Sequence, residues 1–309
     1  MASALAALAL VGWARRAGAA CPWNAEQDGP VEDKIIFGTG LPKAGTRSLG
    51  AALRTMGITA AKSMPGRNAV GIVYKVHRDL LPLAWAGSAN ASAAGSEVNP
   101  LLRLRDVRSW EGPTFFSDFP FYGLPCELQA AYPDAVFIHV QRGCAGWARS
   151  ALRQLFCVWL SNGCAAFQQR RICRDDRVEN HMSVGFCTTL WYFNNLDKGL
   201  LGKLFCRNRK EVCVTVTNER TFNESVPATA AILERLERLC HAHTALVGKC
   251  VPPERLLTLQ LRPDGAEVAR IAPFLGCDDE GDGDRLVAAW TRIGLKGAAN
   301  PVARVGAPR

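Results

Sequence analysis

The segment 34–58, KIIFGTGLPKAGTRSLGAALRTMGI, constrains the fold more than any other part of the chain. A short run of β-forming residues leads into a loop in which Gly38, Gly40 and Gly45 allow tight backbone turns. After the loop, apolar residues recur at helical spacing, and Gly57 is placed to end a helix. The pattern predicts a strand, a loop and a helix in direct succession.

The loop is suited to an anion. A helix that begins near Thr46 directs its free N–H groups back at the loop, and Lys43 adds a positive charge there. The common loop for nucleoside triphosphates has a Lys followed directly by Ser or Thr, after the second glycine. Here Lys43 precedes Gly45, so no hydroxyl directly follows the lysine to hold Mg²⁺. The sequence predicts a phosphate-binding loop of another kind.

A second strand and helix follow the same pattern. Residues Ala135–Gln141 (AVFIHVQ) are typical of a buried strand, which ends at Arg142. Ser150 lies about two turns into the next predicted helix. An arginine suits a phosphate because its planar fork donates two parallel hydrogen bonds.

These two segments resemble the sulfotransferases that use 3′-phosphoadenosine 5′-phosphosulfate (PAPS). Pro-Lys-x-Gly-Thr at residues 42–46 resembles the 5′-phosphosulfate loop of the family, and its continuation with Arg47 and Ser48 is closer to the Golgi carbohydrate type. Arg142 and Ser150, eight residues apart, resemble the 3′-phosphate clamp. Residues Val268–Gly276 resemble a late helix of the family that ends in a Phe-Leu-Gly turn.

The chain also departs from the family. Arg-Gly-Cys stands where the family often has Arg-Asp-Pro or Arg-Asn-Pro, and Ser48 stands where soluble members carry the tryptophan that stacks on adenine. The C-terminal Arg-Lys-Gly that helps to bind the 3′-phosphate has no clear copy; Arg292 or Lys296-Gly297 could take that role.

The resemblance implies a set of site residues. PAPS would be the donor, and no metal is expected. Lys43 would neutralise the charge that grows on the leaving phosphate. The acceptor would be a hydroxyl-bearing small molecule or a glycan. The residues implied in donor binding are Pro42, Lys43, Ala44, Gly45, Thr46, Arg47, Ser48, Arg142 and Ser150.

The acceptor hydroxyl needs a general base, and two candidates remain open. Asp118 lies in Ser-Asp-Phe-Pro, where soluble sulfotransferases carry Thr-His-Leu-Pro with a histidine base. An aspartate is a weak base unless its surroundings raise its pKa. His77 is the alternative, against the ordinary expectation that a lone histidine is a surface or structural residue.

Strands that alternate with helices predict an α/β fold of three layers, like that of P-loop proteins, with a mostly parallel sheet flanked by helices. Binding loops then fall at the carboxyl ends of the strands. We expect a leader and linker over residues 1–30, and one sulfotransferase-like domain over residues 31–309 with a Cys-rich insertion near 157–211 that could form part of an acceptor lid. Further strands are expected at Val212–Thr217 and Leu256–Leu261, and further helices at about Leu124–Ala131, Pro227–Val247 and Leu286–Ile293, the last after an acidic, glycine-rich turn (CDDEGDGD).

The net charge indicates the kind of ligand, and the cysteines indicate the cellular compartment. A net charge of +9 suits anionic ligands, and the sequence has no recognisable nucleic-acid-binding module. The 12 cysteines are even in number and contain no Cys-x-x-Cys pair, which favours disulfides over a zinc or redox motif. Two glycosylation sequons, at Asn90 and Asn223, fit the same compartment. We expect the secretory pathway, either the Golgi lumen or secretion, with a cytoplasmic protein as the alternative.

The N-terminal apolar run of about a dozen residues is too short to span a membrane and resembles the core of a signal peptide, although Arg15 and Arg16 follow it rather than precede it. Membrane association is left open. Two other functions also remain open at this point. One is a P-loop nucleotide kinase or NTPase, against which the missing Gly-Lys-Ser/Thr speaks, and the other is a non-catalytic protein that kept a nucleotide-binding fold.

Overall fold

A five-stranded, wholly parallel sheet forms the centre of the molecule. The structure is a computed structural model and describes residues 35–62, 114–118, 121–159, 192–193, 196–197, 200–216, 219–260, 265–277 and 280–299. The sheet has the strand order β2-β3-β1-β4-β7. Its strands are β1 (Ile35–Gly38), β2 (Thr59–Lys62), β3 (Thr114–Ser117), β4 (Val136–Gln141) and β7 (Leu256–Gln260).

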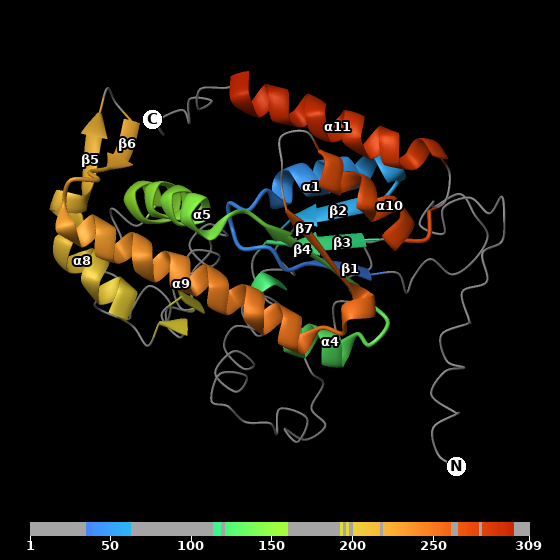
Figure 1. Cartoon of the computed structure of the whole chain (residues 1–309), viewed down its shortest axis with the longest axis horizontal. Helices are drawn as coiled ribbons and strands as arrows, with labels where there is room; N and C mark the ends of the chain where they lie inside the picture. The colour runs from blue at the N-terminus through green and yellow to red at the C-terminus, as the bar shows by residue number, and fades with distance from the viewer. Residues whose placement is uncertain are drawn as a thin grey trace, which may run out of the picture.

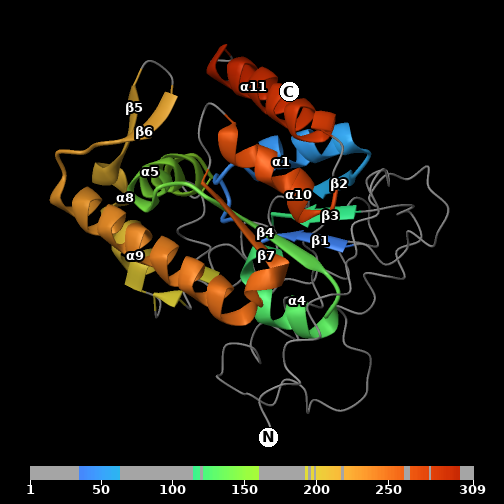
Figure 2. The same cartoon turned by 45° about the vertical axis from the view of Figure 1, so that its right-hand side comes forward.

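Helices cover both faces of this sheet, as Figures 1 and 2 show. On one face lie α1 (Thr46–Leu53), α10 (Ile271–Phe274) and α11 (Glu280–Ala299). On the other lie α4 (Pro125–Ala131) and α9 (Pro227–Cys250). Two more helices, α5 (Cys144–Ala151) and α8 (Leu200–Val212), pack on α9 beyond the end of the sheet. The expected three-layer α/β fold with a parallel sheet is confirmed.

Short helical turns complete the connections. They are η2 (Arg54–Met56), η6 (Phe121–Gly123), the π-helix η7 (Leu152–Trp159), η9 (Pro253–Arg255) and η10 (Ala266–Arg270). Gly57, with a φ of 76°, ends η2 in the left-handed conformation that glycine adopts without strain. The end of this first helical segment was therefore readable in the sequence.

The core is built around β1, the middle strand. All four of its residues are buried, as expected for a strand of a parallel sheet covered on both faces. Phe37 lies against four aromatic rings with centroid distances of 5.5–5.9 Å, those of Phe116, Phe121, Tyr132 and Phe137. This packing fixes the strand that leads into the first loop.

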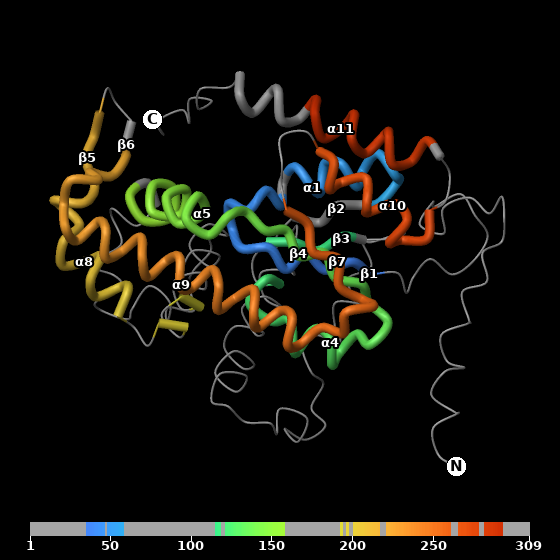
Figure 3. Tube along the Cα trace, viewed as in Figure 1, coloured from blue at the N-terminus to red at the C-terminus, as the bar shows by residue number. Residues whose placement is uncertain are grey.

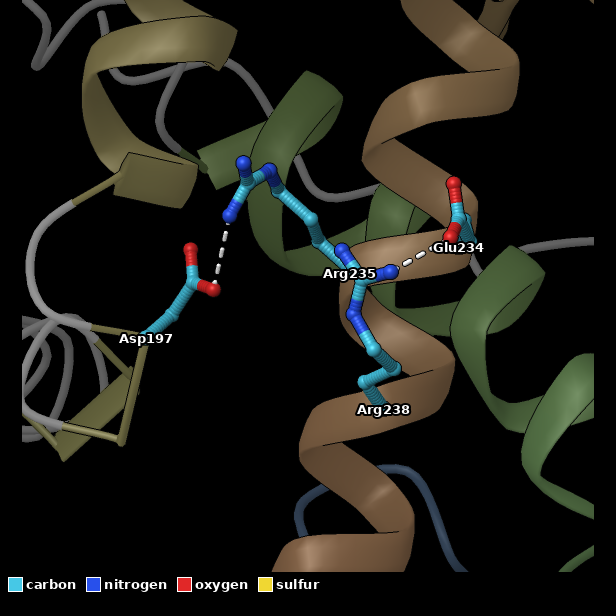
Figure 4. Close-up of polar contacts among 4 residues, drawn as sticks. All are labelled: Asp197, Glu234, Arg235 and Arg238. Carbon is cyan, nitrogen blue, oxygen red and sulfur yellow. Dashed lines mark hydrogen bonds and ion pairs between the residues drawn. The ribbon is translucent and has the colours of Figure 1, made fainter.

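Helix α9 is the longest helix that the structure describes, with 24 residues. It begins with Pro227, which suits the first turn because proline lacks the N–H that would be unpaired there. One stripe of the helix is buried: Thr229, Ile232, Leu236, Leu239, Cys240, His243 and Val247. On the other side Arg238 pairs with Glu234 one turn away, and Arg235 pairs with Asp197 at 2.9 Å (Figure 4). The amphipathic pattern explains why α9 forms and which side faces the core.

Two expectations about the fold need correction. The strand expected at Val212–Thr217 exists as β5 (Cys213–Val216), but it pairs antiparallel with β6 (Glu219–Phe222) in a separate hairpin far from the sheet (Figure 3). Its side chains are half-buried or exposed, so it could not take a central place in a buried sheet. The acidic stretch expected as a turn already belongs to α11 from Glu280 onward, where acidic residues suit the positive end of a helix.

Three disulfides join segments that are far apart in the sequence: Cys126–Cys250, Cys144–Cys240 and Cys157–Cys213. Cys206 and Cys277 are disulfide-bonded as well. Such bonds fit a secretory or lumenal protein. Within the described residues, we find no helix with the length and apolar character that a membrane span requires. The expected leader, the Asn90 sequon and most of the Cys-rich insertion lie outside the described residues.

Candidate functional site

The two predicted phosphate loops lie side by side. The first follows β1 and the second follows β4, and these strands are neighbours in the sheet with Gly38 opposite Ile138. From β1 the chain runs toward one edge of the sheet, where β3 and β2 lie. Strands β4 and β7 lie toward the opposite edge. The carboxyl ends of β1 and β4 therefore flank a topological switch point, where open α/β sheets bind their ligands.

The first loop presents positive groups to solvent. Gly45 precedes α1 with a φ of 102°, and α1 has neither a side-chain cap nor an acidic residue in its first turn. The positive end of the helix dipole is therefore not neutralised by a neighbouring carboxylate of that turn. Lys43 is exposed at a φ of 74°, a conformation that non-glycine residues seldom adopt and that is often found at functional sites.

The base of this loop is packed tightly against β4. A Cβ atom on Gly40 would lie 2.8 Å from the carbonyl oxygen of Val140, so only glycine fits without a backbone shift. The N–H group of Thr39 donates to the carbonyl of Ile138 at 3.1 Å. These contacts hold the first residues of the loop on the neighbouring strand.

A buried polar network joins the same loop to α9. The Nε2–H of His243 donates to the carbonyl of Thr39 at 2.7 Å, which leaves Nδ1 to accept the hydroxyl proton of Tyr192. The Thr39 hydroxyl lies 3.1 Å from Nδ1 of His139 on β4. The ion pair of Asp197 with Arg235 anchors the chain near Tyr192 to α9 (Figure 4). All three polar groups of Thr39 are thus engaged.

Burial keeps both histidines neutral. It lowers the pKa of His139 to about 4 and, together with repulsion from His139, lowers the pKa of His243 to about 3. Burial also raises the pKa of the Tyr192 hydroxyl well above its usual value. The network is therefore uncharged at neutral pH and acts as a hydrogen-bonded support for the loop.

The second loop is more open. Arg142 and Gly143 are both exposed, and a Cβ atom on Gly143 would contact nothing within 4 Å. A Cβ atom on Gly146 would lie 3.8 Å from Nε of Arg142, which places the arginine side chain over the first turn of α5. The same helix reaches the first loop, because Trp147 donates from its indole N–H to the carbonyl of Pro42 at 2.8 Å.

Both loops contribute to one pocket with a volume of about 170 Å³. The first loop supplies Leu41 and Ala44, and the second supplies Arg142 and Gly143. The remaining lining residues come from β4, β7, α5 and α9: His139, Val140, Gln141, Cys144, Trp147, Cys240, His241, His243, Thr244 and Gln260. The pocket is therefore shared by the two loops, and α9 forms a further part of its wall.

The structure separates the predicted site residues into two groups. Ala44 and Arg142 line the pocket, whereas Lys43 and Ser150, both described, are not among its lining residues. The other predicted donor residues lie on or beside the first loop: Pro42 and Thr46 are buried, and Gly45 and Ser48 are half-buried. The side chain of Arg47 lies outside the described part of the structure.

The structure describes only one of the two candidate bases. Asp118 directly follows β3, the strand that pairs with β1, with Ser117 opposite Gly38. It is half-buried, with a φ of 73°, and its carbonyl accepts the N–H of Tyr122 at 3.3 Å. Asp118 is therefore on the strand end next to the first loop. His77 lies outside the described residues.

Sequence reasoning missed the α9 side of the pocket. His241, His243 and Thr244 line it but belong to a helix that was read only for its amphipathic pattern. His139 carried a usable signal, because it is a polar residue inside an otherwise apolar buried strand. Among the described residues we find no cluster of His, Cys, Asp or Glu that could hold a metal ion.

Comparison with known proteins bears on the same region. The comparison with curated proteins returned no match. The family profile of the sulfotransferase domain matches residues 35–279, which include both loops, all five strands of the parallel sheet and α9. Because the match spans most of the chain and contains the whole pocket, the protein belongs to the sulfotransferase family.

Proposed function

We propose that the protein transfers a sulfuryl group from PAPS to a hydroxyl group of its acceptor. One observation carries the proposal: Arg142 and two residues of the first loop, Leu41 and Ala44, line a single pocket at the switch point of the sheet. PAPS has phosphate groups at both ends of its ribose, so it needs two anion sites that open onto the same space. The two loops offer such a pair of sites.

The first loop suits the 5′-phosphosulfate. In the reaction, the acceptor oxygen forms a bond to sulfur while the bond from sulfur to the 5′-phosphate oxygen breaks. The leaving bisphosphate gains negative charge at that oxygen. Lys43 and the N–H groups of Gly45, Thr46 and Arg47 at the start of α1 are the groups that would stabilise this charge, and the hydroxyls of Thr46 and Ser48 would assist them.

Arg142 and Ser150 suit the 3′-phosphate. Arg142 is exposed to the pocket and can donate two hydrogen bonds from its planar group. Ser150 is half-buried on α5, and the first turn of this helix lies under the side chain of Arg142. This assignment leaves adenine to the remaining pocket walls, because Ser48 cannot stack on a base as a tryptophan does.

Asp118 is our candidate for the general base that takes the proton of the acceptor hydroxyl. Its place at the end of β3, one strand away from the loop, supports this role. His77 is the second candidate. A glycan acceptor in the Golgi lumen or outside the cell is the substrate class that we favour, on the basis of the Gly-Thr-Arg loop and the disulfides.

Isothermal titration with 3′-phosphoadenosine 5′-phosphate tests the donor. We expect micromolar affinity without metal, and no comparable affinity for ATP with Mg²⁺. Arg142→Ala should weaken binding about 10- to 150-fold, through loss of a charge-assisted hydrogen bond. Arg153→Ala is the matched control, because this arginine is also exposed but does not line the pocket. Binding of Mg²⁺–ATP alone would favour a kinase or NTPase instead.

Transfer of label from PAPS to a panel of glycans and small hydroxyl compounds tests the reaction. Lys43→Ala should lower the rate about 10²- to 10³-fold with little change in stability, since the side chain is exposed. Binding of the bisphosphate without transfer to any acceptor would instead favour a non-catalytic binding protein. Transfer that survives Lys43→Ala at full rate would contradict the role given to Lys43.

A further inference from the structure

The disulfide between Cys144 and Cys240 lies in the wall of the pocket. Both cysteines line the pocket together with Arg142. Cys144 is the first residue of α5 and follows Arg142 by two positions, while Cys240 belongs to the buried stripe of α9. The other two disulfides with both partners described contribute no cysteine to the pocket.

The turn before Cys144 is open to solvent, and in the described part of the chain the carbonyl of Gly143 accepts the N–H of Trp147 at 2.9 Å. Gly143 caps α5 without a side-chain hydrogen bond, and its Cβ position is open. Arg142 is exposed, and a long exposed side chain on an open turn has many accessible conformations. A covalent bond at the next residue restricts where this turn can lie.

The partner helix holds the first loop as well. His243 follows Cys240 by three positions, so both residues lie on the same face of α9. His243 donates to the carbonyl of Thr39 at the base of the first loop. One face of α9 therefore contacts the base of the first loop through a hydrogen bond, and the start of α5, directly after the second loop, through a disulfide.

We infer that the Cys144–Cys240 disulfide is a positioning element of the donor site, which holds Arg142 at the distance from the first loop that a bisphosphate requires. The inference rests on the proposed function, since it takes the donor to be PAPS. Its ligand is a nucleotide with phosphates at the 5′ and 3′ positions. A nucleotide with only the 5′-phosphate would not depend on the disulfide, because it does not reach Arg142.

The test compares two double variants, Cys144→Ser/Cys240→Ser and Cys126→Ser/Cys250→Ser. The second pair is a matched control, because it also joins α9 to another helix and closes a segment of similar length, 124 against 96 residues. We expect a similar loss of thermal stability in both. The affinity for 3′-phosphoadenosine 5′-phosphate should fall at least 10-fold in the first variant only, while the affinity for adenosine 5′-monophosphate stays unchanged in both.

A double-mutant cycle separates positioning from a general structural effect. Arg142→Ala should weaken bisphosphate binding strongly in the native protein and much less in the protein without the Cys144–Cys240 bond. Full additivity of the two changes would overturn the inference. Equal bisphosphate affinity in both double variants and the native protein would also overturn it, while leaving the proposed function intact. A native protein that does not bind the bisphosphate would overturn both.

A second measurement needs no mutation and serves if the double variants do not fold. A dithiol reductant breaks the S–S bond, leaves two cysteine thiols and is itself oxidised to a disulfide. Because Cys144 lies in the pocket wall, saturating bisphosphate should slow reduction of Cys144–Cys240 several-fold, as measured by alkylation and mass spectrometry. Reduction of Cys126–Cys250 should be unaffected. Equal rates with and without the ligand would contradict the position of the disulfide in the donor site.

Discussion

The two loops that flank the pocket are held in different ways. The first is fixed by many weak contacts: Gly40 packs against β4, Thr39 uses all its polar groups, and Pro42 accepts a hydrogen bond from α5. The second is an open turn whose neighbour, Cys144, is bonded covalently to α9. The contrast matches the separation of tasks that we propose. A loop that binds through its backbone must itself be rigid, whereas an arginine that binds through its side chain needs only an anchored base.

The largest effect should come from a methyl group in the tight loop. Gly40→Ala places a Cβ atom 2.8 Å from the Val140 carbonyl, and a backbone atom cannot turn aside as a side chain can. We expect a loss of about 3 kcal/mol of unfolding free energy and weaker bisphosphate binding. Urea denaturation and isothermal titration measure the two effects. Unchanged stability would mean that the loop is not packed on β4 as described.

Acid should have the second-largest effect, because it lowers the unfolding free energy through the two buried histidines that support the first loop. The unfolded histidine pKa is about 6.5, whereas burial lowers the folded pKa of His139 to about 4 and that of His243 to about 3. The unfolded chain therefore binds more protons in this range, and stability falls as the pH falls below about 6.5. The slope approaches about 1.4 kcal/mol per pH unit for each histidine.

Urea titrations at pH 7.5 and 5.5 check this expectation, with a loss of unfolding free energy of about 2–3 kcal/mol if both histidines contribute. His243→Gln keeps a donor for the Thr39 carbonyl but does not titrate, so its acid sensitivity should be about half as large. An acid sensitivity that is the same in this variant as in the native protein would show that other groups cause it.

The third-largest effect should come from removing the hydrogen bond between Trp147 and Pro42, which links the two loops. Trp147→Phe keeps an aromatic ring in the core but removes the donor to the Pro42 carbonyl, which leaves a buried acceptor without its partner. We expect a loss of about 1–2 kcal/mol of unfolding free energy. Hydrogen exchange of the Ala44 amide, which donates to Leu41 within the loop, should become faster. No change in that exchange rate would mean that Trp147 packs without holding the loop.

The smallest effect is expected in the open turn. Gly143→Ala meets no atom within 4 Å, and the φ of −44° is allowed for alanine. Stability should stay the same or rise by up to about 1 kcal/mol, because alanine restricts the unfolded chain. Thermal unfolding measures this change against Gly40→Ala. A strongly destabilised Gly143→Ala protein would remove the contrast between the loops.

Sequence alone predicted those elements around the candidate site that depend on short-range patterns. The glycines of the first loop, the helix at Thr46 and the arginine after β4 each follow from a few adjacent residues, and so did most of the helices. Strands β2 and β3 were missed because four-residue strands give too short a pattern to stand out from loops. The strand at Cys213 was found, but its pattern says nothing about which sheet it joins.

The contacts made by α9 could not be predicted. Cys144 and Cys240 are 96 residues apart, and Thr39 and His243 are 204 residues apart. An even number of cysteines indicates disulfides but leaves the pairing undetermined. In the sequence, a buried histidine of an amphipathic helix cannot be distinguished from the other core residues of that helix. These contacts depend on the packing of α9 on the sheet, which only the folded structure shows.

The position of α9 in the sequence has a consequence for synthesis of the protein. Cys126 and Cys144 precede α9, and both of their partners, Cys250 and Cys240, lie within that one helix. Both residues must therefore wait as thiols while the intervening chain is made. At about 5–20 residues per second, the ribosome needs roughly 5–20 seconds to add the residues between Cys144 and Cys240. A nascent chain that oxidised earlier could join Cys126 to Cys144, so correct pairing requires an oxidant that acts slowly or an isomerase that reverses the error.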